Sequence, residues 1–72
     1  MPLTLMVNGE TRVLDPAPDP ASLGAVVAFL ANNPQLVVAE HNGVISPRSR
    51  WDSIVVKDDD TLEIVTIVGG GS

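Results

Sequence analysis

The residues with the clearest potential for chemistry lie at the end of the chain, where Gly69-Gly70-Gly71 precede Ser72. Glycine lacks a Cβ atom, so residues 69–72 are predicted to form a flexible tail, narrow enough to enter the active site of a partner. In one interpretation a glycine carboxylate is the reactive group and another enzyme activates it. In the other, Gly-Gly-Gly-Ser is a flexible linker or a cloning remnant. The tail by itself leaves both interpretations open.

Few other side chains offer chemistry. The chain has no cysteine, which excludes disulfides and thiolate zinc sites, and its single histidine, His41, excludes a pair of histidine ligands. His41 also lacks a nucleophile at a recognisable spacing and is interpreted as a turn or strand-end residue. Asp58, Asp59, Asp60 and Glu63 carry oxygen atoms of the kind that bind calcium, but their spacing fits no EF-hand loop. A solvated turn is the favoured interpretation, and we predict no metal site, no bound cofactor and no catalytic residues of the chain's own.

The composition is that of one small acidic domain. Seventy-two residues allow a single domain, and 44% apolar residues with a mean hydropathy of +0.26 favour a folded chain. Four Lys+Arg against nine Asp+Glu give a net charge of −5, which disfavours nucleic acid as a partner. The longest apolar run, residues 25–31, is too short to cross a membrane, and the first residues lack a signal-peptide pattern. We therefore expect a cytoplasmic protein without membrane contact, monomeric when alone.

The first third of the chain predicts a β-hairpin followed by a helix. Apolar residues alternate before and after Asn8-Gly9, the dipeptide most typical of a tight hairpin turn. A proline-rich connector, residues 15–20, leads to a helix that begins at either Asp19 or Ser22 and stops at Asn32-Asn33-Pro34. Gly24 lowers the helix propensity. The helix is expected to pack through the apolar stripe of Leu23, Val26, Val27 and Leu30.

The remainder predicts strands and one irregular segment. Residues 36–40 are interpreted as a buried strand, His41-Asn42-Gly43 as a turn, and residues 44–45 as a very short strand. Trp51 is expected to lie against the core from a turn of helix, and residues 61–68 form the last strand. A helix across one face of such a sheet, with the last strand pairing with the first hairpin, is an α+β arrangement. We predict the β-grasp fold over residues 1–68, with a mixed sheet of four to five strands.

The last predicted strand carries apolar residues on both of its faces. If Leu62 and Ile64 point inward, away from the charged Glu63 side, Val65 and Ile67 point outward. Two outward β-branched residues beside the glycine tail suggest a docking surface on an otherwise acidic domain. The alternative is that they are scattered surface apolar residues, which are common.

A longer motif now identifies a family. Residues 38–51, VAEHNGVISPRSRW, are similar to the segment AVAVNGEVVPRSQW, with Asn42, Pro47, Arg48 and Trp51 in matching places. The opening residues 7–10 and the closing residues 62–65 and 68–71 match as well. The whole chain thus resembles the thiamine-biosynthesis sulfur carrier family (ThiS), within the ubiquitin-like β-grasp group.

This resemblance implies a function that needs no catalytic residues. A ubiquitin-activating-like adenylyltransferase would use ATP and magnesium to adenylate the terminal glycine carboxylate. A persulfide donor would convert it to a thiocarboxylate, and thiazole synthase would receive the sulfur. Gly71 is the first candidate for the reactive glycine and Gly70 the second, with Gly69 in the tail. We expect Val65, Ile67, Val68 and Arg48 to contact partners.

Two departures from the family pattern leave alternatives. Family members end on glycine, whereas Ser72 follows here: either it is removed, or the chain ending at Ser72 cannot be activated. They also usually carry Asp-Gly-Asp before the last strand, so Asp59 would bear a small strain if its φ is positive. A molybdopterin-synthase small subunit or another thiocarboxylate carrier shares the expected fold and tail. A passive β-grasp interaction module with a linker tail is the alternative from another class.

Overall fold

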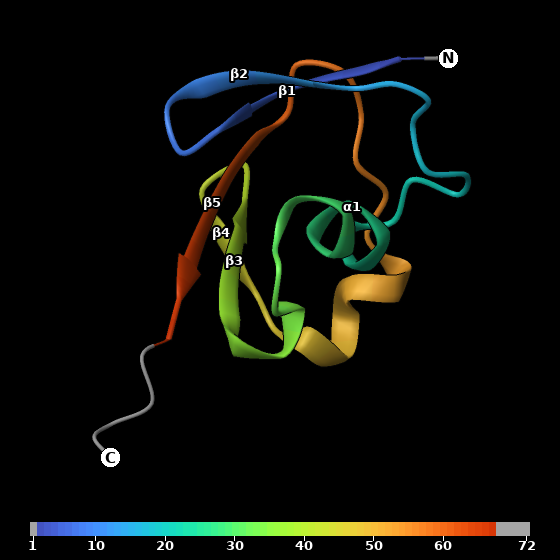
Figure 1. Ribbon diagram of the computed structural model, residues 1–72. Helices are drawn as coiled ribbons and strands as arrows, with labels where there is room; N and C mark the ends of the chain where they lie inside the picture. The colour runs from blue at the N-terminus through green and yellow to red at the C-terminus, as the bar shows by residue number, and fades with distance from the viewer. Residues whose placement is uncertain (1, 68–72) are drawn as a thin grey trace.

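The computed structural model describes residues 2–67 and contains five strands, one α-helix and two short 3₁₀ helices (Figure 1). No helix within this range is long and apolar enough to cross a membrane. The elements, in chain order, are β1 (Leu3–Val7), β2 (Glu10–Leu14), α1 (Leu23–Leu30), η1 (Pro34–Leu36), β3 (Val37–His41), β4 (Val44–Ser46), η2 (Arg48–Ser53) and β5 (Thr61–Thr66).

The last strand occupies the centre of the sheet. The strand order is β2-β1-β5-β3-β4, with β1 and β5 parallel and the other neighbouring pairs antiparallel. The helix α1 and the 3₁₀ helix η2 lie on one side of this sheet (Figure 1). This arrangement is the predicted β-grasp fold, including the pairing of the last strand with the first hairpin.

Both predicted Asn-Gly turns form, and they form in the same way. Asn8 and Gly9 have φ angles of 51° and 82°, and Asn42 and Gly43 have 52° and 84°. Two successive residues with positive φ match the type I′ turn, whose twist suits a two-residue hairpin. These turns join β1 to β2 and β3 to β4.

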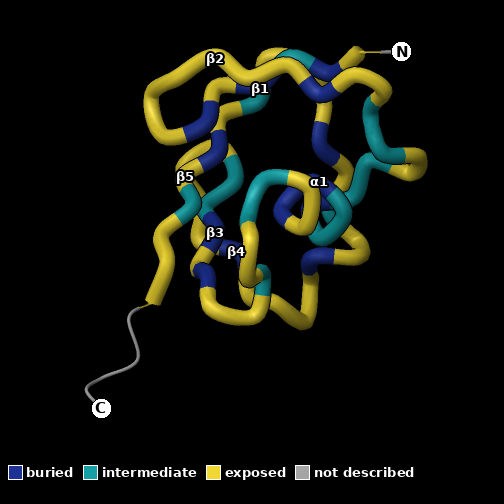
Figure 2. The backbone as a smooth tube through the Cα atoms, in the orientation of Figure 1, coloured by how far each residue is buried: buried dark blue, intermediate teal, exposed yellow. Residues whose placement is uncertain are grey.

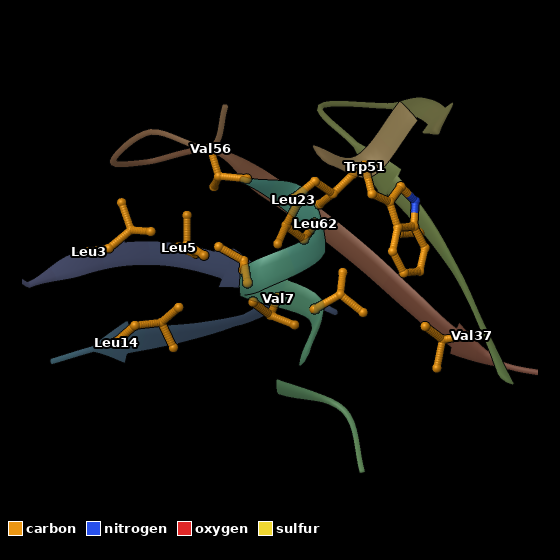
Figure 3. Close-up of a cluster of buried hydrophobic side chains, with 12 residues drawn as sticks. Leu3, Leu5, Val7, Leu14, Leu23, Val37, Trp51, Val56 and Leu62 are labelled. Atoms are coloured by element: carbon orange, nitrogen blue, oxygen red, sulfur yellow. The ribbon is translucent and has the colours of Figure 1, made fainter. Parts of the chain in front are cut away.

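Alternation along the strands builds the core. Leu3, Leu5 and Val7 of β1 face the helix side of the sheet and are buried, whereas Met6 is 40% exposed. Each fully buried aliphatic side chain contributes about 1.5–3 kcal/mol relative to exposure. Figure 2 shows that buried positions occur both on the sheet and on α1, and Figure 3 shows the side chains of this cluster, with Leu3, Leu5 and Leu23 among those labelled. The full set of buried hydrophobic residues is Leu3, Leu5, Val7, Leu14, Leu23, Val26, Val27, Val37, Ala39, Trp51, Val56 and Leu62.

The helix begins at the later of the two predicted caps. The Ser22 hydroxyl accepts a hydrogen bond from the Ala25 N–H at 3.1 Å, so Ser22 and not Asp19 is the N-cap. Gly24, which lowers helix propensity, allows η2 to approach. A Cβ atom there would lie 3.4 Å from Trp51 Cβ and 3.0 Å from an Asp52 carboxylate oxygen.

Four strand boundaries differ from the sequence prediction, and two of these differences are one-residue extensions, of β3 to His41 and of β4 to Ser46. Leu36 belongs to η1 and is 47% exposed, and β3 begins one residue later. This strand is also only half-buried, because Val37 and Ala39 are buried whereas Val38, which alternation places on the opposite face of the sheet, is 38% exposed. The last strand was predicted to reach Val68, but β5 ends at Thr66, and Val68 lies outside the described residues.

Candidate functional site

The predicted inward and outward faces of β5 are confirmed. Leu62 is fully buried and Ile64 is half-buried, whereas Val65 is 60% and Ile67 is 52% exposed. The two outward residues lie on the face of the sheet opposite α1, at the end of β5 from which the chain leads to the glycines. We call the sheet surface on the side away from α1 the open face. Val68, Gly69, Gly70 and Gly71 lie outside the described residues.

Side chains from β3 and β4 extend the apolar part of the open face next to β5. Val38 lies directly opposite Val65 in the register of β3 and β5. Ile45 of β4 is 65% exposed and pairs with Glu40. The open face therefore presents Val38, Ile45 and Val65 on three neighbouring strands. Sequence analysis identified only the β5 members, because their neighbours depend on the order of the strands.

Asn8 fixes the second half of β5, a role beyond the turn that sequence analysis assigned to it. Its side-chain amide donates to the Ile64 carbonyl oxygen at 3.0 Å, and its Oδ1 accepts from the Ile64 N–H at 2.8 Å. This reciprocal pair continues the β1–β5 ladder beyond the end of β1. It holds the strand segment immediately before Val65 and Ile67.

A polar cluster fixes the start of β5. Asn42 Oδ1 accepts from the Thr61 N–H at 2.8 Å, and His41 Nε2 lies 2.7 Å from Asp60 Oδ2. Asp60 Oδ2 also accepts from the Lys57 N–H at 2.9 Å. Burial raises the pKa of Asp60, but hydrogen bonds from His41, Lys57 and Asn42 outweigh it and lower the pKa below its ordinary value. His41 is thus placed at a strand end as predicted, in contact with an aspartate of the charged turn.

The three aspartates before β5 form hydrogen bonds to other residues of the chain. Asp58 Oδ1 accepts from the Thr4 N–H at 2.9 Å, and the Asp59 N–H donates to the Thr4 carbonyl oxygen at 2.8 Å. Asp59 has a φ of 70°, the positive value considered above for the position that usually holds glycine. Within residues 2–67, no group of three or more His, Asp or Glu side chains is placed to hold a metal ion. The two hydrogen bonds from this turn to Thr4 therefore connect β1 to the start of β5.

Arg48, a predicted partner contact, makes its contacts within the chain on the helix side of the sheet. Its guanidinium carbon lies 4.7 Å from the centre of the Trp51 ring, and its Nη2 donates to the carbonyl oxygens of Gln35 at 2.6 Å and Val37 at 3.4 Å. Trp51 is 5% exposed, and its indole N–H donates to the Ser46 carbonyl oxygen at 2.9 Å. The two matching residues of the PRSRW segment thus support β3 and β4. A partner contact of Arg48 stays a prediction.

Comparison with known proteins assigns the family. The model of the ThiS family matches residues 5–71, nearly the whole chain and all three glycines. The chain belongs to the ThiS family. The crystal structure of the thiamine biosynthesis protein ThiS from Geobacter metallireducens is similar, with a TM-score of 0.79 and 30% sequence identity over 96% of this chain and 100% of that one. These matches confirm the resemblance and support a sulfur carrier role.

Two sequence relatives show different settings for a ThiS-like segment. An uncharacterized protein, ycf40, from Trieres chinensis is 32% identical over 94% of this chain and 89% of its own length. A thiazole synthase from Paramagnetospirillum magneticum is 34% identical over 97% of this chain, but the match covers only 21% of that protein. ThiS proteins are small sulfur carriers rather than catalysts, and membership implies interaction with partners in thiamine biosynthesis.

Proposed function

We propose that this protein carries sulfur as a C-terminal thiocarboxylate and donates it to the thiazole moiety of thiamine. The observation that carries the proposal is the match of the ThiS family through Gly71, on a chain whose central strand leads to that glycine. A glycine at this position has no side chain to obstruct a partner's active site. The β-grasp domain supplies recognition, and the glycines at residues 69–71 supply the reactive end once Ser72 is removed.

The first chemical step is activation. A carboxylate is a poor electrophile, so the glycine carboxylate attacks the α-phosphorus of ATP and releases pyrophosphate. The resulting acyl-adenylate has AMP as a good leaving group. The partner adenylyltransferase holds ATP and magnesium and supplies this chemistry. The carrier contributes the carboxylate and the surface by which it is recognised.

Sulfur transfer follows on the same carbonyl carbon. The terminal sulfur of a persulfide attacks the acyl-adenylate and displaces AMP, which forms an acyl disulfide. A second thiol then cleaves the S–S bond and is itself oxidised to a disulfide with the donor. The thiocarboxylate left on the carrier passes its sulfur to thiazole synthase. The occurrence of a ThiS-like segment within a protein named thiazole synthase supports this last partner.

Intact mass spectrometry tests the proposal. The chain ending at Gly71 is incubated with ATP, magnesium, a sulfide source and the adenylyltransferase of the same organism. We expect a mass gain equal to sulfur replacing one oxygen, and no gain without ATP. A chain that keeps Ser72 and a chain with Gly71→Ala serve as controls for the identity of the reactive end. If the chain ending at Gly71 gains no mass, the carrier function is wrong and the passive interaction module is favoured.

The thiamine pathway is separated from its rivals by the acceptor. The thiocarboxylate form is mixed with thiazole synthase or with the large subunit of molybdopterin synthase, each with its own substrates. We expect loss of sulfur from the carrier only with thiazole synthase. Transfer only to the molybdopterin enzyme would assign the chain to that pathway instead.

A further inference from the structure

The end of β5 has no neighbouring strand on the side of β1. Pairing with β1 stops at Leu62, and β5 continues past the turn between β1 and β2 (Figure 1). The Ile67 N–H donates to the Leu36 carbonyl oxygen on the β3 side, so alternation points the backbone groups of Thr66 to the opposite side. The side chain of Asn8 occupies only the preceding position on that side. The backbone N–H and C=O of Thr66 therefore border a gap in the sheet.

A cleft of about 380 Å³ lies beside this part of β5. Its walls come from the end of β1, from β5 and from residues 30–33 at the end of α1. Val7 and Ile64 line it with apolar atoms, and Arg12 and Thr66 add polar ones. Ligand sites in proteins are concave, mostly apolar and about 300–1,000 Å³ in volume, with a few polar groups. The cleft has the size and lining of such a site.

The cleft is positively charged in an otherwise acidic protein. Among residues 2–67, Arg12 is the one charged residue that lines it, and Arg12 forms no ion pair. Glu10, two residues away on β2, does not line the cleft. A free anion is repelled by the net charge of −5. An anion attached to the chain itself is held close, at an effective concentration of about a millimolar.

The reactive end of the chain is such an anion, and it starts from the cleft. Gly71 lies five residues beyond Thr66. Hairpin loops of four residues are common, and a loop over residues 67–70 would bring Gly71 opposite the Thr66 N–H. Glycines adopt positive φ without strain and need little width. The carboxyl end of α1 weakly opposes an anion here, but hydrogen bonds from Thr66 and Arg12 to a charged group are the stronger effect.

We infer that residues 68–71 of the free carrier fold back into this cleft, where the Gly71 carboxylate accepts hydrogen bonds from the Thr66 N–H and the Arg12 guanidinium. This inference rests on the proposed function, because it takes the carrier form that ends at Gly71 after removal of Ser72. It adds regulation: the activating partner must draw the glycines out of the cleft before adenylation. The thiocarboxylate is also an anion and binds in the same place.

The first test is NMR spectroscopy of the free carrier that ends at Gly71. Nuclear Overhauser contacts are expected between the amides of residues 69–71 and the methyl groups of Ile64. Arg12→Gln is expected to abolish them. Arg50→Gln, which removes the same charge from a residue of η2 outside the cleft, should keep them. Absence of these contacts in the wild type, or their full retention in Arg12→Gln, would overturn the inference.

A second variant blocks the cleft without changing its charge. Ala31 lines the cleft and has φ −108° and ψ 139°, an extended conformation that larger residues also adopt. Ala31→Phe is expected to expel the glycines and abolish the same contacts. Contacts that Ala31→Phe leaves unchanged would place the glycines elsewhere and overturn the inference.

Two other occupants are tested on the wild type. Loss of the contacts on addition of acetate at about one millimolar would make a free anion the better ligand. Contacts that appear only between molecules, in a mixture of ¹⁵N-labelled and ¹³C-labelled carrier, would assign the glycines to a second copy. Either result would overturn the inference. Intramolecular contacts that persist in acetate support it.

Activation kinetics connect the cleft with the proposed function. Arg12→Gln and Ala31→Phe are expected to lower the KM of the adenylyltransferase for the carrier by about twofold to fivefold, because no fraction of the carrier is withheld. A KM that does not fall would overturn the regulatory role. If the contacts are present but the wild type gains no sulfur, the cleft assignment stands and the proposed function is wrong. If the wild type gains sulfur without the contacts, the proposed function stands and this inference is wrong.

Discussion

The two Asn-Gly turns share a dipeptide and a backbone conformation but differ in how they hold the central strand. Asn8 has a φ of 51° and Asn42 a φ of 52°, and both direct side-chain oxygen atoms to backbone N–H groups of β5. Asn8 uses its oxygen and its nitrogen on the same residue, Ile64. Toward β5 the Asn42 side chain uses only its oxygen, on Thr61, and the Asn42 backbone N–H donates to the Thr61 carbonyl oxygen at 2.8 Å, whereas the Asn42 amide nitrogen lies toward His41 and Asp60.

The difference follows from what the neighbouring strand already provides. On the β3 side, β5 pairs from His41↔Leu62 to Val37↔Thr66, along most of its length. On the β1 side the pairing stops at Val7↔Leu62, with one more backbone bond from the Asn8 N–H to the Leu62 carbonyl oxygen. The second half of β5 would lack a partner there without the Asn8 amide. The Asn8-Gly9 turn thus replaces missing strand pairing on the β1 side of β5. The Asn42-Gly43 turn supplements a complete ladder on the β3 side.

Substitution of Asn8 is expected to have the largest effect. Asn8→Ala removes two hydrogen bonds and places an alanine at positive φ, at a combined cost of about 2–3 kcal/mol in the free energy of unfolding. Asn8→Gly keeps the backbone conformation without strain and isolates the hydrogen bonds, at about 1–2 kcal/mol. Urea unfolding measures both variants, and hydrogen exchange should show the Ile64 amide losing protection. Unchanged stability in Asn8→Gly would contradict a strand-replacing role.

Asn42→Gly is expected to cost less, about 0.5–1.5 kcal/mol, because only one side-chain hydrogen bond to β5 is lost. The glycine keeps the positive φ, and the backbone bond from residue 42 to Thr61 stays. Exchange should speed up at the Thr61 amide and not at Ile64. A larger loss of stability in Asn42→Gly than in Asn8→Gly would reverse the comparison.

The sequence could predict the two turns but not the hydrogen bonds that their asparagine side chains make to β5. Positive φ at Asn-Gly is a local property of the dipeptide, and the outward direction of Val65 follows from alternation with buried Leu62. The contact of Asn8 with Ile64 spans 56 positions and depends on the parallel register of β1 and β5, which no local pattern sets. Arg48 shows the same limit. The resemblance matched its position, but only the packing of its guanidinium on Trp51 reveals what it supports.

The smallest effect on stability is expected when the pH is lowered. It is also the effect that distinguishes the two turns most clearly. The hydrogen bonds of Asn8 involve no titratable group, whereas Asn42 lies in a cluster with His41 and Asp60. Hydrogen bonds lower the pKa of Asp60 below its ordinary value near 3.8, despite the opposing effect of burial. A carboxylate with a lowered pKa in the folded state stabilises the fold above its unfolded pKa, and this contribution is lost as the pH falls through the folded pKa.

Asp60→Asn should therefore be less stable than the wild type at neutral pH, by up to about 1 kcal/mol because the site is partly solvated. The difference should shrink as the pH falls below the ordinary aspartate value near 3.8. Urea unfolding across this range measures it, and protection of the Thr61 amide should follow the same pH dependence while protection of Ile64 does not. If Asp60→Asn stays less stable than the wild type even at a pH well below the ordinary aspartate value, the substituted side-chain amide disturbs the turn by its shape. The charge of Asp60 would then not be what secures the start of β5.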